Sequence, residues 1–393
     1  MDESFEVVEL DQRPCCVHYL ECFDVFLVGT YQLLNSIEDA RAKSRHLDAF
    51  SKDELESYLI KINSRLGNFA VIKQDNDEKF KCVSKFECEE SGGVFDFILS
   101  KQSEDTCEIF AAHSNGTFGI YNLEQRNCTE LDLTALSSVD VPEAKMLTCI
   151  DKFPDERCLV AVGDSEGSLS LIANEQVVLQ KLCDTTNPIW QVRCINMVSG
   201  KRIIIVGTET SSWCIFELKN AWDVSQRKLE VIYKHSSDVY NPGITCIVRM
   251  SCDIGALRNN QEAFRILVGS YDETLTCYQL VFGDGQREPK VEFVSVKNLT
   301  DGGVWRVKQI PPSRKSIARL YVAAMYAGSF KLVSSGPEEG FDFESLEPKQ
   351  LLELASPMFS EKPLHYDIDF SPLSSACCIA DFNNSLCVIK YDR

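Results

Sequence analysis

One short pattern of apolar and polar positions recurs along the whole chain. An apolar strand ends in a small residue, a turn rich in polar residues or glycine follows, and a second apolar strand comes next, as in LVAVGDSEGSLSLI. Seven copies are found, and their small residues are Gly29, Ala112, Gly163, Gly207, Gly269, Ala324 and Ala380. After the first interval these positions lie 44 to 62 residues apart, which is typical of four-stranded propeller blades lengthened by loops.

Each copy is preceded by another short apolar run, so three strands can be assigned to each of seven blades. The runs are CVHYL, GVFDFIL, MLTCIDKF, IWQVRCINM, GITCIVRM, GVWRVKQI and YDIDFSP. The last blade reaches Arg393 after its third strand, and we expect the segment from Phe5 to Leu10 to supply its outer strand, which leaves no open sheet edge. Residues 1–393 are therefore predicted to form one all-β domain, a seven-bladed WD-repeat-like β-propeller.

The first interval is longer because a helix is predicted within blade one. Ser51 and Glu54 have the spacing of a capping box. An apolar stripe follows, at Leu55, Leu59, Ile62 and Leu66. Gly67 is placed to end this helix after about four turns. Residues 35–66 are thus predicted to form a helical insertion whose stripe packs on the side of the propeller; the alternative is a helix that binds a partner.

The charge balance narrows the classes of partner. The chain has 40 Lys and Arg residues against 59 Asp and Glu residues, a formal net charge of -19. This charge opposes binding of a phosphate backbone, so we expect no nucleic-acid partner. An acidic surface favours cationic partners, although the simpler interpretation is a surface that keeps the protein in solution.

The cysteines and the first residues of the chain indicate a compartment. None of the 18 cysteines forms a CxxC spacing, and most stand inside apolar runs, where a thiol behaves as a small buried hydrophobe; this is typical of a reducing compartment. The acidic start MDESFEVVELDQ has no apolar signal core, and no run reaches the ~18 apolar residues of a membrane helix. We therefore expect a cytoplasmic monomer without a membrane partner.

The sequence lacks motifs for metals and nucleotides. The histidines are His18, His46, His113, His235 and His365. No two of them have a metal-ligand spacing on one element, and neither GxGxxG nor GxxxxGK[ST] occurs. We expect neither a metal ion nor a cofactor.

Two columns of side chains emerge when the first strands of the blades are aligned. The aromatic column holds Phe95, Trp190, Trp305 and Tyr366. The polar column holds Asp96, Gln191, Thr245, Arg306 and Asp367. Because side chains alternate along a strand, one column points into the central channel and the other between blades. We expect the polar column to line the channel and the aromatic column to wedge between blades, with a substrate cage as the alternative role of the aromatics.

One string, GDSEG from Gly163 to Gly167, fits the GxSxG pattern of an esterase nucleophile elbow. The elbow requires a strand, a sharp turn and a helix, but the residues that follow, SLSLI, read as a strand. We interpret GDSEG as a β-hairpin turn, with Ser165 as a nucleophile in the alternative. His113 and Asp164 hold equivalent turn positions in adjacent blades, so a His, Asp and Ser cluster on one face is a further hypothesis, although polar residues are expected at turns in any case.

Four strings go beyond a generic propeller: GTYQL, GSYDE, GGVWR and YDIDFSP. Together they resemble the diphthine methyltransferase family, WD-repeat proteins that, despite their name, hydrolyse the methyl ester of diphthine. The resemblance extends over all seven blades, and its specific part is GGVWR combined with GTYQL and SYDE. It implies that the chain removes the methyl ester from methylated diphthine on a histidine of elongation factor 2, before the final amidation to diphthamide.

The resemblance also implies roles at the mouth of the channel. The implied substrate-binding residues are Tyr31, Tyr271, Trp305 and Arg306, and Tyr366 of the aromatic column is a further substrate-binding candidate. Trp305 would face a cationic group and Arg306 the ester or carboxylate oxygens, while the glycines before Trp305 would let the chain enter the strand closely.

The resemblance identifies no catalytic residue, so the candidates remain open. They are His113, Asp164, Ser165, Asp272, Glu273 and Arg306. In an esterase, a carboxylate or a histidine would act as general base, and Arg306 or turn amides would stabilise the oxyanion. The second hypothesis is a non-catalytic scaffold for protein complexes, for example in trafficking, because a propeller fold does not establish an activity.

Overall fold

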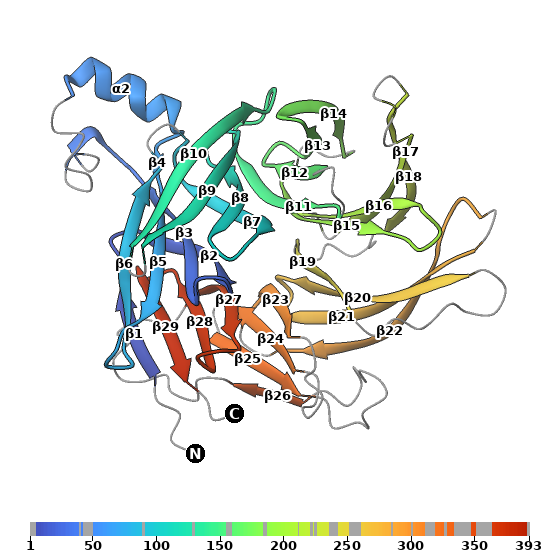
Figure 1. Cartoon of the computed structure of the whole chain (residues 1–393). Coiled ribbons are helices and arrows are strands. Elements are labelled where there is room, and N and C mark those ends of the chain that lie inside the picture. The colour runs from blue at the N-terminus through green and yellow to red at the C-terminus, as the bar shows by residue number, and fades with distance from the viewer. Residues whose placement is uncertain are drawn as a thin grey trace.

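The computed structural model describes most of the chain. The described residues are 5–38, 41, 50–88, 91–127, 130–154, 159–183, 187–210, 212–220, 223, 226–235, 243–250, 261–283, 286–299, 302–310, 319–325, 328–333, 347–350 and 364–390. Their strands form seven antiparallel sheets around a central axis (Figure 1). The predicted seven-bladed β-propeller is therefore confirmed. His46 lies outside the described residues.

Blades 1 to 4 follow one another along the chain, each from the inner strand outward. Blade 1 contains β2 (Arg13–Leu20), β3 (Val25–Leu33), β5 (Asn68–Gln74) and β6 (Phe80–Glu87), with the short β4 (Arg65–Leu66) paired to β3. Blade 2 contains β7 (Val94–Gln102), β8 (Thr106–His113), β9 (Thr117–Asn127) and β10 (Glu130–Asp140). Blade 3 contains β11 (Leu147–Lys152), β12 (Val160–Asp164), β13 (Ser168–Ala173) and β14 (Gln176–Leu182). Blade 4 contains β15 (Ile189–Asn196), β16 (Arg202–Thr208), β17 (Trp213–Lys219) and β18 (Lys228–His235).

The remaining blades complete the ring. Blade 5 contains β19 (Ile244–Arg249), β20 (Glu262–Ser270), β21 (Thr274–Phe282) and β22 (Lys290–Asn298). Blade 6 contains β23 (Val304–Ile310), β24 (Arg319–Ala324), β25 (Gly328–Val333) and β26 (Glu347–Gln350). Blade 7 contains β27 (His365–Ser371), β28 (Ala376–Asp381), β29 (Ser385–Lys390) and, as its outer strand, β1 (Phe5–Glu9).

The two ends of the chain meet in blade 7, as the sequence predicts. Strand β1 pairs antiparallel with β29, from Phe5 opposite Ile389 to Glu9 opposite Ser385. The Leu10 N–H extends this pairing by donating to the Asn384 carbonyl at 2.7 Å. The first residues therefore close the ring and cover the edge of β29.

The helical insertion begins as predicted but ends earlier. Helix α2 (Lys52–Lys61) has the capping box, with the Glu54 N–H donating to Ser51 Oγ at 3.3 Å and the Ser51 N–H to Glu54 Oε2 at 2.8 Å. The prediction that the helix continues to Gly67 is wrong. Asn63 and Ser64 take positive φ values of 52° and 51°, which stops the helix, and the next two residues form β4 instead.

The apolar stripe packs within the insertion rather than on the side of the propeller. Leu55, Ile62 and Leu66 are buried together with Leu34, which directly follows β3. Beyond the helix, Asn63 Nδ2 donates to the carbonyls of Ser114 at 2.9 Å and Lys145 at 3.3 Å. These contacts fix the end of the insertion on the β8–β9 turn and on the loop before β11.

The core lies between the blades and includes most of the thiols. Twelve of the fifteen cysteines in the described residues are buried, and all fifteen are free thiols. Cys107, Cys246 and Cys277, for example, are members of the apolar clusters between neighbouring blades. The expectation that thiols act here as small apolar side chains is confirmed. Among the helices of the described residues, none has the length and apolarity needed to cross a membrane.

Candidate functional site

In every blade the pairing of the first strand with the second shifts by one residue near the start. The extra residues are Cys15, Phe95, Thr148, Trp190, Thr245, Trp305 and Tyr366. A β-bulge re-aims the side chains beside it. This bulge therefore sets which residues face the axis and which stand at the end of the propeller where the first strands begin.

The bulge corrects one member of the polar column. In blade 5, Cys246 pairs with Gly269, as Arg306 pairs with Ala323 in blade 6. Thr245 is thus equivalent to Trp305, and its predicted place beside Arg306 is wrong, because a slip of one residue exchanges the two faces of a strand. The residues that follow the bulge form a ring, named the central ring here: Cys16, Asp96, Cys149, Gln191, Cys246, Arg306 and Asp367.

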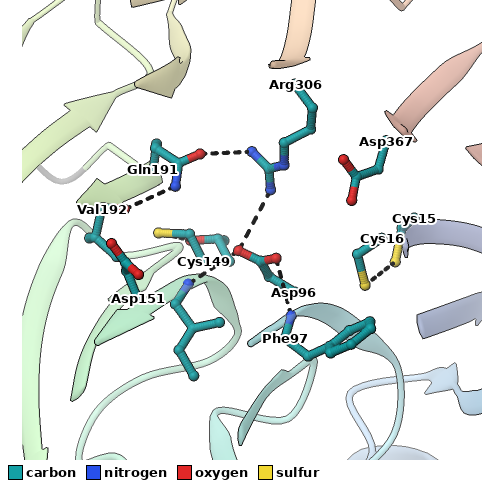
Figure 2. Close-up of polar contacts among 12 residues, drawn as sticks. Cys15, Cys16, Asp96, Phe97, Cys149, Asp151, Gln191, Val192, Arg306 and Asp367 are labelled. Carbon is teal, nitrogen blue, oxygen red and sulfur yellow. Dashed lines mark hydrogen bonds and ion pairs between the residues drawn. The ribbon is translucent and has the colours of Figure 1, made fainter. Parts of the chain in front are cut away.

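Arg306 crosses the axis and joins four blades. Its Nη1 donates to Gln191 Oε1 at 3.3 Å and to the Thr245 carbonyl at 3.0 Å, and its Nη2 lies 3.8 Å from Asp96 Oδ2 (Figure 2). Arg306, Asp96, Gln191 and Asp367 are all buried. The four polar residues of the predicted channel lining thus surround the axis, and the planar guanidinium holds three of the blades through separate contacts.

The charges of the central ring compensate one another. Burial alone would lower the pKa of the Arg306 guanidinium, but the carboxylates of Asp96 and Asp367 outweigh it and the pKa is raised. Burial raises the pKa of the Asp96 carboxyl, although Arg306 acts against this shift. Burial also raises the pKa of the Cys149 thiol to about 12 and that of Cys246 to about 11, so these thiols are protonated and inert as nucleophiles at neutral pH.

Seven aromatic side chains form a continuous arc at the end of the propeller where the first strands begin. In order of contact the members of this aromatic arc are Phe95, Tyr31, Phe382, Tyr366, Trp305, Trp190 and Tyr271, with Trp190 and Tyr271 both touching Trp305. The ring centroids of neighbours lie 5.0 to 6.3 Å apart. Trp305 is buried at the hub, whereas the other six are partly exposed. The arc therefore combines inter-blade packing with accessible aromatic faces.

The arc is open at blade 3. Where the bulge residue is small, as at Cys15 and Thr245, a tyrosine from the end of the second strand or the turn after it joins the arc instead. In blade 1 this is Tyr31, near the end of β3, and in blade 5 it is Tyr271, in the turn after β20. Blade 3 has Thr148 at the bulge and Ser165 at the turn. Among the described residues, every blade except blade 3 thus contributes an aromatic side chain to the arc.

Two charged side chains contact aromatic residues of the arc. Glu209, on the turn of blade 4, accepts a hydrogen bond from Trp190 Nε1. The Arg13 guanidinium carbon lies 4.0 Å from the centroid of Phe382. An anionic group and a cationic group are therefore held at two different points of the arc.

The predicted substrate-binding residues come together, and Arg306 lies next to them. Tyr31, Tyr271, Trp305 and Tyr366 are all members of the aromatic arc. Gly303 approaches the turn of blade 5 closely, since a Cβ added there would lie 2.8 Å from Tyr271 Cα. The backbone approach expected for GGVWR is therefore present, and it places the start of β23 against the turn that carries Tyr271.

Within the described residues, no hydrogen bond joins His113, Asp164 and Ser165, the members of the hypothetical cluster, and His113 and Asp164 bond within their own blades. His113 is buried, and its Nε2 lies 2.8 Å from the Tyr121 hydroxyl. Asp164 Oδ1 accepts the N–H groups of Glu166 at 2.9 Å and Ser168 at 2.8 Å, which caps the turn. Ser165 follows in the same turn and leads into strand β13. GDSEG is a hairpin turn, as interpreted from the sequence.

Asp272 and Glu273 are turn residues as well. Asp272 Oδ1 accepts the Thr274 N–H at 3.0 Å. Glu273 has a positive φ of 68°, and its carbonyl accepts the Leu299 N–H at 2.8 Å. Both residues shape the hairpin between β20 and β21. Of the catalytic candidates, only Arg306 belongs to the central ring.

Asp96 and Asp367 are carboxylates of the central ring that the catalytic candidates omitted. Each follows an aromatic residue of the arc as Arg306 follows Trp305, and this shared aromatic–charged dipeptide is the signal that would have found them. Within the described residues, the side chains that could ligate a metal ion are His365, Asp381 and Cys387, whose ligand atoms lie within 4.8 Å of one another. They come from three different strands of blade 7, so no short spacing in the sequence predicts that they lie together.

Comparisons with known proteins agree with the fold. No protein-family model matches the chain, and no curated protein matches it. Among solved structures it is similar to Raptor from Chaetomium thermophilum, with a TM-score of 0.61 and 10% sequence identity over 99% of this chain and 29% of the Raptor chain. At this identity the similarity shows the fold alone. The chain is a WD-repeat-like β-propeller with an aromatic arc beside a charged central ring.

Proposed function

We propose that the protein hydrolyses the methyl ester of methylated diphthine on elongation factor 2. The observation that carries the proposal is the aromatic arc, seven contacting rings of which six keep exposed surface. Methylated diphthine has a fixed trimethylammonium group, and aromatic faces bind such groups by about 0.5 to 2 kcal/mol each. The net charge of -19 favours the same cation at longer range.

The central ring supplies the polar chemistry next to the arc. The guanidinium carbon of Arg306 lies 5.7 Å from the ring centroid of Trp305, the residue of the arc that contacts three others. Hydrolysis of an ester passes through a tetrahedral intermediate with negative charge on the former carbonyl oxygen, and a fixed cation lowers the energy of that charge. The products are methanol and the diphthine carboxylate, and neither a metal nor a cofactor takes part in this proposal. The substrate is on elongation factor 2, so the protein would act in the cytoplasm.

The test follows the mass of the modified peptide of elongation factor 2. The purified full chain is incubated with elongation factor 2 that carries methylated diphthine, and the peptide is then measured by mass spectrometry. The proposal expects the loss of one CH₂ unit, because hydrolysis replaces a methyl group by hydrogen. An unchanged mass after complete mixing at micromolar enzyme contradicts the proposal.

The second candidate is a non-catalytic scaffold that binds a modified or cationic partner. It is favoured by the turn roles of His113, Asp164, Asp272 and Glu273, which are used for the fold. The same incubation separates the two candidates. A scaffold leaves the mass of the peptide unchanged while elongation factor 2 stays bound through gel filtration.

A further inference from the structure

Two members of the central ring keep more exposed surface than the rest. Arg306 is 9% exposed and Asp96 is 8% exposed, whereas the other five members are between 0% and 3% exposed. Each follows an aromatic residue of the arc, Trp305 and Phe95 respectively. Arg306 and Asp96 are therefore the least buried charged groups of the ring, and each is adjacent in sequence to a member of the arc.

The carboxylate of Asp96 is held in place from both sides. Its Oδ1 accepts the Phe97 N–H at 3.1 Å, and its Oδ2 accepts the Ile150 N–H of the next blade at 3.3 Å. Arg306 Nη2 lies 3.8 Å from Oδ2 (Figure 2). Each carboxylate oxygen has a second lone pair, so Asp96 can accept a proton from a water molecule while it keeps these contacts.

We propose that Asp96 is the general base of the ester hydrolysis and that Arg306 stabilises the oxyanion; this assignment rests on the proposed function. Asp96 takes a proton from water as the water oxygen bonds to the ester carbonyl carbon. The bond from that carbon to the methoxy oxygen then breaks, and Asp96 returns the proton to the leaving methoxide. Methanol leaves, and the new carboxylic acid loses its own proton to solvent.

The surroundings of Asp96 suit this role. Burial raises the pKa of the Asp96 carboxyl from its ordinary value, and the charge of Asp367 adds to this, while Arg306 and Lys308 act against it. A raised pKa makes the carboxylate a stronger base near neutral pH. Charged or titratable groups face it from four neighbouring strands: Cys16, Cys149, Arg306, Lys308 and Asp367.

Asp151 provides a matched control. Its Oδ1 accepts the N–H of the next residue, Lys152, at 2.9 Å, and its Oδ2 accepts the Cys194 N–H of the next blade at 2.9 Å. An arginine, Arg193, lies 3.8 Å away. Asp151 therefore accepts the same kinds of hydrogen bond as Asp96 and also has an arginine nearby. It differs in position, because it lies two residues after Cys149 of the central ring and is not adjacent to a residue of the arc.

The test compares Asp96→Asn with Asp151→Asn on elongation factor 2 carrying methylated diphthine. Each change removes one acceptor for an N–H of the next blade, so both variants should lose similar thermal stability. We expect Asp96→Asn to lower kcat at least 100-fold with KM within about threefold of wild type, and Asp151→Asn to stay within about threefold in both. An Asp96→Asn variant with kcat within threefold of wild type overturns the assignment but leaves the proposed function intact. A wild-type protein without hydrolysis overturns both.

A second variant covers the case in which Asp96→Asn does not fold. Asp96→Glu keeps the carboxylate and moves it, so the fall of kcat/KM on the acid side of the pH profile should persist with its midpoint shifted by half a pH unit or more. An acid limb identical to that of wild type shows that another group is the base.

Discussion

Blades 1, 3 and 5 differ from blades 2, 4, 6 and 7 in the two residues at the bulge of the first strand. The first group begins with a small residue and a cysteine: Cys15-Cys16, Thr148-Cys149 and Thr245-Cys246. The second group begins with an aromatic and a polar residue: Phe95-Asp96, Trp190-Gln191, Trp305-Arg306 and Tyr366-Asp367. The same backbone irregularity thus presents two different sets of side chains at one end of the propeller.

In the first group the bulge residue fastens the blade to its neighbour. Cys15 Sγ donates to the Val94 carbonyl at 2.7 Å. Thr148 and Thr245 donate from Oγ1 to the first carbonyl of the next blade in the same way. The cysteine that follows lies over a glycine of the second strand, so its sulfur packs on its own blade. In these three blades the two residues therefore stabilise the fold, and the charged residues near the axis come from the other blades.

In the second group the same two positions make the candidate site. The aromatic residue joins the arc, and the polar residue enters the central ring. The dipeptide at the bulge therefore distinguishes the blades that contribute to the aromatic arc and the charged part of the ring from those that do not. Four predictions test this division.

The largest effect is expected at the hub of the arc. Trp305→Ala should lower the free energy of unfolding by about 3 to 5 kcal/mol. It should also lower kcat/KM of the folded molecules by roughly ten- to thirtyfold, because the accessible rings of Trp190, Tyr271 and Tyr366 lose the side chain that they pack against. Trp305→Phe should lose much less. Thermal unfolding and single-turnover hydrolysis are measured on the same preparations. Trp213→Ala, in the buried core of blade 4, is the control that lowers stability alone; folded Trp305→Ala with normal hydrolysis would remove the arc from the site.

A smaller effect is expected where cysteine lies over glycine. A Cβ added at Gly269 would lie 2.5 Å from Cys246 Sγ and 2.6 Å from Val304 Cγ1, so Gly269→Ala should lower the free energy of unfolding by about 1 to 3 kcal/mol through overpacking. The double variant Gly269→Ala with Cys246→Ala relieves the contact and should recover part of that loss. Denaturant unfolding measures both. Equal stability of Gly269→Ala and wild type would show that the cysteine does not pack there.

His113, the last residue of β8, gives the stability a pH dependence of similar size. Burial lowers the pKa of His113 to about 4, so the unfolded chain binds a proton below about pH 6.5 that the folded chain does not. The stabilisation is complete above that pH and is lost as the pH falls toward 4. The gap in unfolding free energy between wild type and His113→Gln should therefore shrink by about 2 kcal/mol from pH 7 to pH 5. A gap that is constant over this range contradicts the buried, neutral imidazole.

The smallest effect is expected at the turn of blade 3, where the arc is open. Ser165→Ala should leave ester hydrolysis within about twofold of wild type, because the serine is part of a hairpin turn. Steady-state rates on elongation factor 2 check this. A thousandfold loss of kcat in a folded variant would make Ser165 the nucleophile and remove Asp96 from that role.

The sequence was sufficient for the features that depend on local periodicity. The blade count, the closing strand from Phe5 and the capping box at Ser51 all follow from patterns a few residues long, and each is confirmed. The hairpin at GDSEG follows in the same way, since a strand and not a helix comes next. The repeats can be recognised in the sequence because every blade must bury the equivalent faces of its strands, which repeats the same apolar pattern.

Features set by irregular backbone or by ring closure could not be predicted. The positive φ of Asn63 shortens the helix without a glycine. The bulge moves Thr245 out of the polar column, although its polarity suggested otherwise. The contact of Arg306 with Asp96 joins residues 210 positions apart in the sequence, and only the closed ring brings them together. The charged part of the candidate site is therefore a property of the assembled blades.

One measurement compares the two groups of blades on the proposed reaction. Single-turnover hydrolysis of methylated diphthine on elongation factor 2 is followed by peptide mass for wild type, Trp305→Ala and Thr245→Val, two changes at the equivalent bulge position of adjacent blades. The account predicts that wild type removes the ester, that Trp305→Ala is at least about tenfold slower per folded molecule, and that Thr245→Val loses stability but keeps the rate. A wild-type protein that leaves the mass unchanged, or equal rates for the two variants, would contradict it.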